Sequence, residues 1–113
     1  MNISTIDYSF KNQKYRDMFI SDEKIIVGRC TLLLSSQSIF LYNLYTVEAY
    51  RNIGIATKII QTIQKERIPI TLSVDTDNNK AVLLYKKLGF IITREQDNEV
   101  TMVCIPKNNK VCI

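Results

Sequence analysis

Two apolar runs separated by a short polar stretch stand out in the first half of the chain. Residues 25–34 read IIVGRCTLLL, residues 35–38 are turn-like, and residues 39–46 are again apolar and aromatic. Runs rich in β-branched and aromatic residues, bounded by small polar residues, are typical of paired strands. The pattern predicts an antiparallel hairpin over residues 25–46. Residues 1–21 are less regular: residues 3–6 suggest a short strand, and the spacing of Tyr15, Met18 and Phe19 predicts about one turn of helix.

The hydrophobic period changes after Tyr50. Apolar residues then recur at the i, i+3, i+4 and i+7 positions of an amphipathic helix, at Ala56, Ile59, Ile60 and Ile63. Pro69 bars the continuation of this helix. Residues 70–75 alternate between apolar and polar side chains, which is the period of a strand with one apolar face. Strand, helix and strand in this order predict a βαβ unit with parallel strands.

A second helix is expected after this strand, with Asp77 or Asn78 as its N-cap and Gly89 at its C-terminal end. Its apolar positions have helical spacing: Ala81, Leu84, Tyr85 and Leu88. Residues 90–93 and 100–105 then predict a closing hairpin across the polar residues 94–99, and the tail from residue 106 is expected to fray.

Length and composition indicate one domain over residues 1–113. The chain is 46% hydrophobic and 23% charged, which is the balance of an ordinary globular protein. Its formal charge of +4 is mild, and the basic residues are scattered along the chain. Nucleic-acid binding is therefore not expected, because it usually requires a localised basic face. A slightly basic surface would suit an anionic cofactor.

Missing residue types exclude several kinds of site. The chain has no histidine, which removes Ser-His and Cys-His nucleophiles, histidine bases and histidine-ligated metals, so no metal site is expected. Its cysteines are Cys30, Cys104 and Cys112, an odd number without CxxC spacing, and we expect free thiols. With no apolar stretch of signal-peptide or membrane-spanning length, a cytoplasmic, intracellular location and no membrane contact are predicted.

A glycine-containing turn joins the first hairpin to the first helix. It reads Arg51-Asn52-Ile53-Gly54-Ile55-Ala56. Gly54 can take backbone angles closed to other residues, and with Ala56 it keeps side chains away from a group that approaches the main chain. Free amides at a helix N-terminus, together with the helix dipole, bind phosphate oxygens. The amides of about Asn52 to Thr57 are candidates for holding a pyrophosphate, although the same pattern also suits a simple tight helix start.

A second motif follows on the next helix. Residues 78–90 have the form N-x-x-A-x-x-L-Y-x-x-x-G-F, at a separation from the glycine turn that fits one βαβ unit. At this point the chain resembles the GNAT family of acyl-CoA-dependent N-acyltransferases, from about Leu44 to Phe90. The stretch LYTVEAYRNIGIATKII is similar to the family's pyrophosphate-loop motif. The resemblance implies a single GNAT-like domain of the α/β class, with a mixed, centrally splayed β-sheet flanked by helices.

The resemblance also implies site residues and a cofactor, acetyl-CoA. Backbone groups of Leu44, Tyr45 and Thr46 would meet the pantetheine arm, as would Asn78, and Tyr85 would stand beside the cofactor sulfur. The residues implied to hold the pyrophosphate form one continuous loop: Arg51, Asn52, Ile53, Gly54, Ile55, Ala56 and Thr57.

The implied chemistry is acetyl transfer by direct attack of a neutral amine on the thioester. Backbone amides near Thr46 are candidates for stabilising the oxyanion. Tyr85, protonated at neutral pH, is the candidate acid for the departing sulfur. The alternative for Tyr85 is a packing role on the apolar face of its helix.

Two departures from the family pattern leave alternatives open. The family often supplies a Glu from the strand before the loop, and residues 39–46 contain no carboxylate. Glu48, Asp75 or a water relayed through Tyr42, Asn43 or Ser73 could take the place of that base. Only 43 residues precede Leu44, where the family usually has a strand, two helices and a further hairpin. The acceptor groove is then open to a large acceptor, completed by a second subunit, or lost.

We therefore expect an N-acetyltransferase that moves an acetyl group from acetyl-CoA to an amine acceptor, which is a small molecule, a peptide or a protein. The alternative is a non-catalytic acyl-CoA-binding or protein-interaction module on the same fold. A homodimer is also expected, because little of the short N-terminal half is left to cover the sheet edge.

Overall fold

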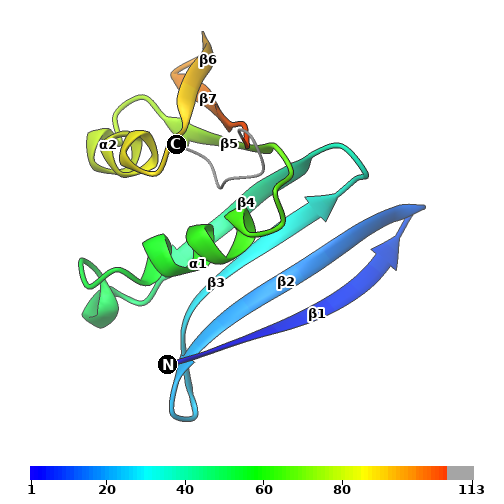
Figure 1. The fold of residues 1–113 in the computed structure, drawn as a ribbon. Helices are drawn as coiled ribbons and strands as arrows, with labels where there is room; N and C mark the ends of the chain where they lie inside the picture. Colours follow the sequence, from blue (N-terminus) through cyan, green and yellow to red (C-terminus); the bar gives the residue numbers. More distant parts are fainter. Residues whose placement is uncertain (107–113) are drawn as a thin grey trace.

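The computed structural model describes residues 1–106, which form one mixed sheet with two helices (Figure 1). The strands are β1 (Asn2–Phe10), β2 (Gln13–Asp22), β3 (Ile25–Leu34), β4 (Ile39–Thr46), β5 (Ile70–Asp75), β6 (Ile91–Gln96) and β7 (Glu99–Cys104). The helices are α1 (Ile55–Gln64) and α2 (Asn79–Lys87), with a short 3-10 turn η1 (Glu48–Tyr50) before α1. The α/β class, the first hairpin and the βαβ unit are confirmed.

The sheet is mixed and opens at its centre. Its strand order is β1-β2-β3-β4-β5-β7-β6, and β4 and β5 form its parallel central pair. That pair is joined only at Ile39–Ile70 and Phe40–Thr71, after which the two strands separate. The remaining three-quarters of β4 keeps its antiparallel partner β3 on the other side. The predicted splay of the sheet is confirmed, and Figure 1 shows β5 leaving the line of β4.

The N-terminal prediction was wrong in part. Tyr15, Met18 and Phe19 lie in strand β2 rather than in a helical turn, and the strand predicted over residues 3–6 extends over all of β1. The two strands pair along their whole length across the two-residue turn Lys11-Asn12, where both residues have positive φ. A turn of this kind matches the twist of two long antiparallel strands. Cross-strand pairing therefore overrides the weak helical spacing.

The closing hairpin is confirmed with a tighter turn than predicted. β6 and β7 extend into the polar residues, so that only Asp97 and Asn98 form the turn, again with positive φ at both positions. The predicted fraying of the tail concerns residues that lie mostly outside the described range.

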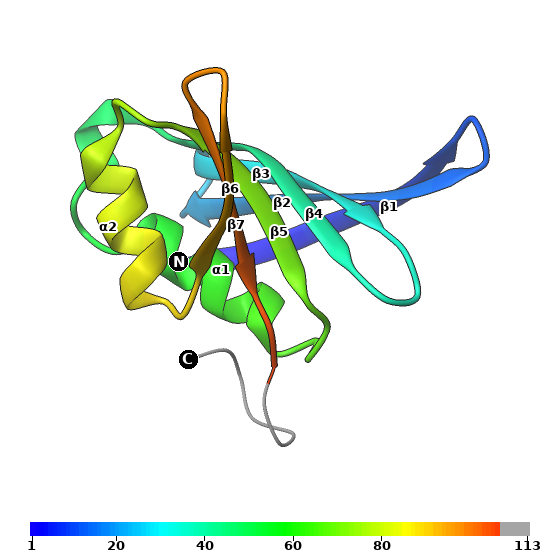
Figure 2. The ribbon, with the colours of Figure 1, turned by 90° about the horizontal axis from the view of Figure 1, so that it is seen from above.

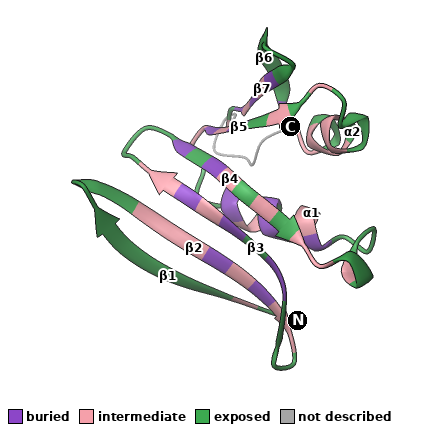
Figure 3. Cartoon of the chain, turned by 180° about the vertical axis from the view of Figure 1, so that it is seen from behind, coloured by how far each residue is buried: buried purple, intermediate pink, exposed green. Residues whose placement is uncertain are grey.

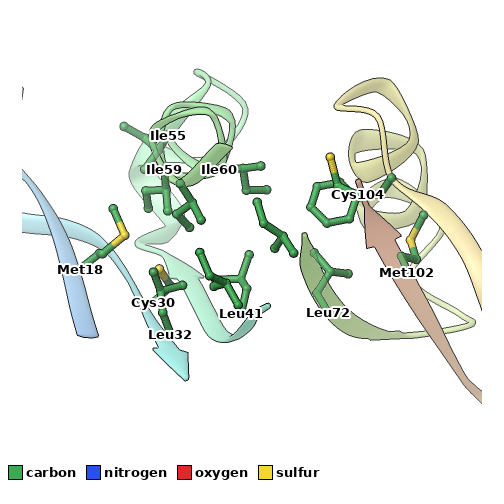
Figure 4. Close-up of a cluster of buried hydrophobic side chains, with 14 of the residues drawn as sticks. Met18, Cys30, Leu32, Leu41, Ile55, Ile59, Ile60, Leu72, Met102 and Cys104 are labelled. Atoms are coloured by element: carbon green, nitrogen blue, oxygen red, sulfur yellow. The ribbon is translucent and has the colours of Figure 1, made fainter. Parts of the chain in front are cut away.

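Both helices lie on the same face of the sheet (Figures 2 and 4). The buried face of α1 consists of Ile55, Ile59, Ile60, Ile63 and Gln64. The Gln64 side-chain amide donates to the Leu88 carbonyl at 2.7 Å and so links α1 to the end of α2. Ile6, Tyr8 and Phe10 on β1 and Phe40 on β4 are exposed, and Figure 3 shows β1 exposed along nearly its whole length. Apolar burial is thus one-sided in the N-terminal half.

Gly28 on β3 lets the start of α1 lie directly on the sheet. A Cβ atom at this position would stand 2.8 Å from Cγ2 of both Ile20 and Ile55. Ile55 is the first residue of α1, so the spacing between this strand and the helix N-terminus depends on the missing side chain.

We expect Gly28→Ala to lower the free energy of unfolding by about 1–3 kcal/mol, the usual cost of an overpacked core. It should also weaken binding of CoA, which is expected at the N-terminus of α1, because Ile55 has to move. Thermal unfolding with and without CoA measures both effects. A variant with unchanged stability would show that α1 is not seated as closely as described.

The two cysteines among the described residues differ, and Cys112 lies outside that range. Cys30 is a free, buried thiol, and burial raises its pKa to about 12, so it is neutral at physiological pH. Cys104 is disulfide-bonded, and the prediction of a free thiol was wrong there. Within residues 1–106, neither helix is long and apolar enough to cross a membrane.

Candidate active site

The site begins where β4 leaves β5. The β3–β4 register shifts here, because Thr31 pairs with Tyr42 while Arg29 pairs with Tyr45. Asn43 and Leu44 therefore stand opposite Cys30 alone, and Asn43 takes a positive φ of 56°. Such a bulge bends a strand and redirects the side chains that follow. It lies beyond the last β4–β5 pair, so the backbone of Leu44 to Thr46 has no pairing partner on β5.

The N-terminus of α1 is open. Its N-cap is Gly54, with φ 89° and ψ 15°, no side-chain cap and no acidic residue in the first turn. The first helical hydrogen bond runs from the Lys58 amide to the Gly54 carbonyl at 3.0 Å. The amides of Ile55, Ala56 and Thr57 thus precede the helical hydrogen-bond ladder and point out of the helix end. A Cβ on Gly54 would meet nothing within 4 Å, so the space beside this N-cap residue is open.

Arg51 holds the turn against β4. Its Nε donates to the Thr46 carbonyl at 2.9 Å, and its guanidinium lies 5.5 Å from the centre of the Tyr45 ring. The turn is fixed on its other side by Tyr50, whose hydroxyl donates to Asp22 at 3.0 Å. Only one of the five guanidinium donors is used in the bond to Thr46, so Arg51 both positions the turn and leaves a positive charge at the site.

A cleft of about 740 Å³ runs between β4, the α1 N-terminus and α2. It is lined by nearly all the residues predicted to bind a cofactor: Leu44, Tyr45, Thr46, Arg51, Asn52, Gly54, Ile55, Ala56, Thr57 and Asn78, together with Tyr85. Ile53 is the exception, because its side chain is 61% exposed and lies outside the lining. This volume lies within the usual range of small-molecule and cofactor sites.

The cleft lining includes residues that were not predicted. Lys80 and Lys87 add two cations from α2, and Leu83 and Leu84 add an apolar wall. Together with Arg51 the lining has three cations and, among the described residues, no carboxylate. The four α2 residues, Lys80, Leu83, Leu84 and Lys87, have the spacing i, i+3, i+4 and i+7 and so lie on one face of the helix. This spacing can be recognised in the sequence once the helix is known to border a cleft.

Asn78 caps α2, as predicted. Its side-chain oxygen accepts a hydrogen bond from the Ala81 amide at 3.2 Å. The oxygen is therefore engaged, and the amide nitrogen is the group that remains for a ligand. Because Asn78 lines the cleft, it serves as a cap and faces the site at once.

Tyr85 is half-buried on α2, with its ring 5.9 Å from that of Phe90. Burial raises the pKa of its hydroxyl above the ordinary value, so that the group keeps its proton at all physiological pH values. Among residues 1–106 the hydroxyl has no side-chain hydrogen-bond partner, and Tyr85 lines both this cleft and a second cavity. Tyr85 thus combines a packed ring with an available, protonated donor.

The second cavity, of about 290 Å³, lies in the opening between β4 and β5 and shares Leu44, Asn78 and Tyr85 with the larger cleft. Most of the residues predicted as candidates for taking up the amine proton line this second cavity, and one lies outside it. Tyr42, Asn43, Ser73 and Asp75 all line this cavity, as does Glu99, which was not predicted. Glu48 is exposed on η1 and lines neither cavity. Glu99 becomes visible as a candidate only once β7 is known to pair with β5.

Comparison with known proteins now identifies the architecture. Residues 14–92 match the family model described as an acetyltransferase (GNAT) domain. No curated protein matches the chain.

Solved structures with the same fold have low sequence identity to this chain. The PaiA N-acetyltransferase of Thermoplasma acidophilum, solved with coenzyme A, is 18% identical with a TM-score of 0.69, over 79% of this chain and 59% of that one. Arabidopsis thaliana Naa50, solved with a bisubstrate analogue, is 23% identical with a TM-score of 0.69, over 77% and 70%. The Escherichia coli ribosomal-protein-S18-alanine N-acetyltransferase is 17% identical with a TM-score of 0.72, over 81% and 68%.

At these identities the structures show a shared fold, and this chain spans less than two-thirds of the Thermoplasma protein. The family model covers most of the chain, from the start of β2 into β6, and includes the open sheet, the glycine turn and α2. The chain belongs to the GNAT acetyltransferase family.

Proposed function

We propose that this protein is an N-acetyltransferase that binds acetyl-CoA in the 740 Å³ cleft and passes the acetyl group to an amine in the second cavity. The observation that carries the proposal is the junction of the two cavities at Tyr85. A donor that keeps its proton stands where a cofactor from one side and an acceptor from the other would meet. The coenzyme A bound to the Thermoplasma protein and the CoA-based analogue bound to Naa50 support the choice of cofactor.

The residues of the cleft fit the parts of such a cofactor. The free amides of Ile55 to Thr57, with the positive end of the α1 dipole, suit a pyrophosphate. Arg51 and the two lysines of α2 add positive charge for a polyanion. Backbone groups of Leu44 to Thr46 and the Asn78 side-chain amide suit the amide groups of the pantetheine arm. The loop is held in this form before any ligand arrives, because Arg51 and Tyr50 tie it to β4 and β2.

When bound, acetyl-CoA supplies an activated acyl group as a thioester. A backbone amide near Thr46 stabilises the negative charge that develops on the carbonyl oxygen; loss of such a contact costs about 3 kcal/mol in other enzymes. The Tyr85 hydroxyl donates its proton to the departing sulfur as the carbon–sulfur bond breaks. The amine proton leaves on the acceptor side, through water held by Tyr42, Asn43 or Ser73, or to a carboxylate of the same cavity.

Mass spectrometry tests this function directly. Candidate small amines, peptides and proteins are incubated with acetyl-CoA, and each is searched for the mass of one added acetyl group. A product that forms only with the protein supports the enzyme. If CoA binds and no acceptor is modified, the second candidate function holds, a non-catalytic acyl-CoA-binding module. The absence of a carboxylate from β4 favours that candidate.

We also expect a homodimer. β1 is an edge strand of nine residues, nearly all exposed, without the Pro or Lys that commonly protect such edges. Ile6 and Phe10 on its outer face are each 58% exposed. Light scattering at high protein concentration should give twice the mass of one chain, and Ile6→Lys should reduce it. A wild-type mass of one chain would contradict the dimer and leave the face open to a large acceptor.

A further inference from the structure

The apolar side of β1 faces away from the helices. Asp7 on β1 accepts two hydrogen bonds from the Arg16 guanidinium at 2.7 and 3.0 Å, and the same guanidinium donates to Glu66, just beyond α1, at 3.0 Å. Asp7 therefore lies on the helix side of the sheet. Because side chains alternate along a strand, its neighbours Ile6 and Tyr8 project from the opposite face. A sheet with one solvated face normally turns its apolar residues toward the core, and over most of its length β1 does the reverse.

The neighbouring strands are also apolar on this outer side. One row of directly paired residues crosses four strands, from Tyr8 through Tyr15 and Leu33 to Phe40. The rings of Tyr8 and Tyr15 stack at 5.4 Å. We call the apolar set on this side of β1 to β4 the aromatic face: Ile6, Tyr8, Phe10, Tyr15, Phe19, Leu33, Phe40 and Tyr42. Within residues 1–106 no helix covers it, because α1 and α2 both lie on the other side of the sheet (Figure 2).

The interior of the aromatic face carries two charges of opposite sign. Asp17 on β2 accepts hydrogen bonds from the Tyr8 hydroxyl at 3.2 Å and from the Thr31 hydroxyl at 2.9 Å. Arg29 lies two residues from Thr31 on β3, is exposed, and forms no ion pair with any residue of the described range. Lys11 stands at the rim, in the turn between β1 and β2. The interior is thus neutral, although the chain has a formal charge of +4.

The exposed area of the aromatic face is that of a protein interface. Ile6 and Phe10 are each 58% exposed, Tyr8 41% and Phe40 37%, and the other four members are half-buried. With about 200 Å² for each side chain, the face exposes roughly 500 Å² of mostly apolar surface. One partner of a standard interface buries about 800 Å², of which a little more than half is apolar. Exposed apolar patches of this size mark interaction sites.

We propose that a second copy of this chain packs on the aromatic face, so that the two sheets form a face-to-face sandwich. This rests on the homodimer proposed above and specifies its interface. Sheets pack in this way about 10 Å apart, with the side chains of their inner faces interlocked. A second copy presents the same neutral, apolar surface, and a two-fold axis between Asp17 and Arg29 brings Arg29 of one protomer to Asp17 of the other. Nucleic acid or an anionic membrane would instead select a basic surface.

The partner would also border the second cavity. Tyr42 belongs to the aromatic face and lines that cavity, and Phe40 is the last residue of β4 that pairs with β5. The aromatic face therefore ends where the sheet opens, and a chain seated on it forms an outer wall beside the proposed acceptor position. The cleft proposed for CoA is bordered by α1 and α2 on the helix side, so cofactor binding does not need the partner.

Light scattering of two variants tests the interface. Phe40→Lys places a charge in the aromatic face on β4, an interior strand, and should convert the dimer into a monomer at the same protein concentration. Arg29→Glu changes an exposed residue and makes both interior charges negative, so it should raise the dimer Kd by about ten-fold or more. Melting curves establish that each variant is folded, and Arg29→Glu decides the matter if Phe40→Lys is not. A wild-type mass of one chain, or a full dimer in the folded variants, would overturn the proposal.

Ile92→Lys is the matched control. Ile92 is 41% exposed and lies on β6, at the opposite edge of the sheet from β1. The change again replaces an exposed apolar side chain with a lysine, outside the aromatic face, and the variant should remain a dimer. Loss of the dimer in this variant would place the interface elsewhere and refute the sandwich.

Hydrogen exchange separates the sandwich from a dimer that joins two β1 edges. In the sandwich the outward backbone amides of β1 stay unpaired, so their exchange should not slow as the dimer forms, whereas edge pairing would slow it. Slowed β1 amides would therefore overturn the proposal. Neither this measurement nor light scattering needs turnover. If the sandwich forms and no acceptor is acetylated, the interface stands and the proposed activity fails; the melting-temperature rise with CoA should persist in Phe40→Lys.

Discussion

Tyr85→Phe is expected to lower kcat by about two to four orders of magnitude, the usual worth of a positioned general acid. The change removes one hydroxyl and keeps the ring that lies against Phe90. CoA affinity should change little, because the hydroxyl has a task only when a thiolate leaves. Turnover of the best acceptor and thermal unfolding with CoA measure the two effects separately.

Tyr45→Phe is the matched control for this variant. Tyr45 lines the same cleft, is 48% exposed and loses the same single hydroxyl, yet it lies on β4 beside Arg51 rather than at the junction of the cavities. Its rate should stay close to that of the wild type. If Tyr85→Phe kept nearly the full rate, Tyr85 would be a core aromatic, and catalysis would depend on positioning and the oxyanion contact.

The pH profile gives a further check on the same hydroxyl. Because burial raises the pKa of Tyr85, the acid stays protonated as pH rises, and it should cause no loss of kcat below about pH 10. A rate that falls between neutral pH and about pH 9 would point to another proton donor.

Gly54→Glu is expected to abolish CoA binding. The wild type should bind CoA in the micromolar range and melt at a higher temperature in its presence, because a ligand that binds only the folded state stabilises it. A glutamate at this position places a negative charge in front of the amides of α1, where the phosphates would lie. It also puts a side chain into the left-handed conformation, at a cost of about 1–2 kcal/mol. Melting curves with and without CoA distinguish lost binding from lost folding.

Gly54→Asn separates charge from backbone strain. Asparagine tolerates the left-handed conformation and is neutral, so this variant should fold and retain part of its CoA affinity. The order of affinity should be wild type, then asparagine, then glutamate. Equal CoA-induced shifts for all three would mean that the phosphates do not lie at the α1 N-terminus, and absence of a shift in the wild type at millimolar CoA would refute the cofactor assignment.

Strong local signals explain which parts of the fold could be predicted. The core-facing stripe of α1 is apolar except at Gln64, and Asn78 and Gly89 mark the two ends of α2, so both helices were placed correctly. β2 failed because the spacing of Tyr15, Met18 and Phe19 fits a helix equally well, and its strand form comes from pairing with β1 and β3. The hydrogen bonds that β2 makes with its two neighbouring strands are not encoded in the hydrophobic period of β2 itself.

The predicted residues of the site also lie in local sequence motifs, whereas the residues that were missed depend on the fold. The glycine turn and the Asn78 and Tyr85 positions are contiguous motifs, and the structure brings them to one cleft. The sequence analysis did not predict Lys80, Lys87 and Glu99 as site residues. A surface lysine or glutamate has no functional signature until the cavity beside it is known. The bulge in β4 was also not predicted. Its residue with positive φ is Asn43, whereas the usual sequence signal of such a bulge is a glycine.

The opening between β4 and β5 also divides the sheet mechanically. Strands β1 to β4 and strands β5 to β7 share only two paired positions, so their remaining connection runs through side chains of the core and α1. Hydrogen exchange should therefore be uneven along β4, with slow amides beside β3 and faster ones where the strand borders the opening. Small rotations of one half against the other would widen or narrow the opening while most of the backbone hydrogen bonds stay in place. Such a motion would let bulky products leave the opening between β4 and β5 while the sheet stays folded.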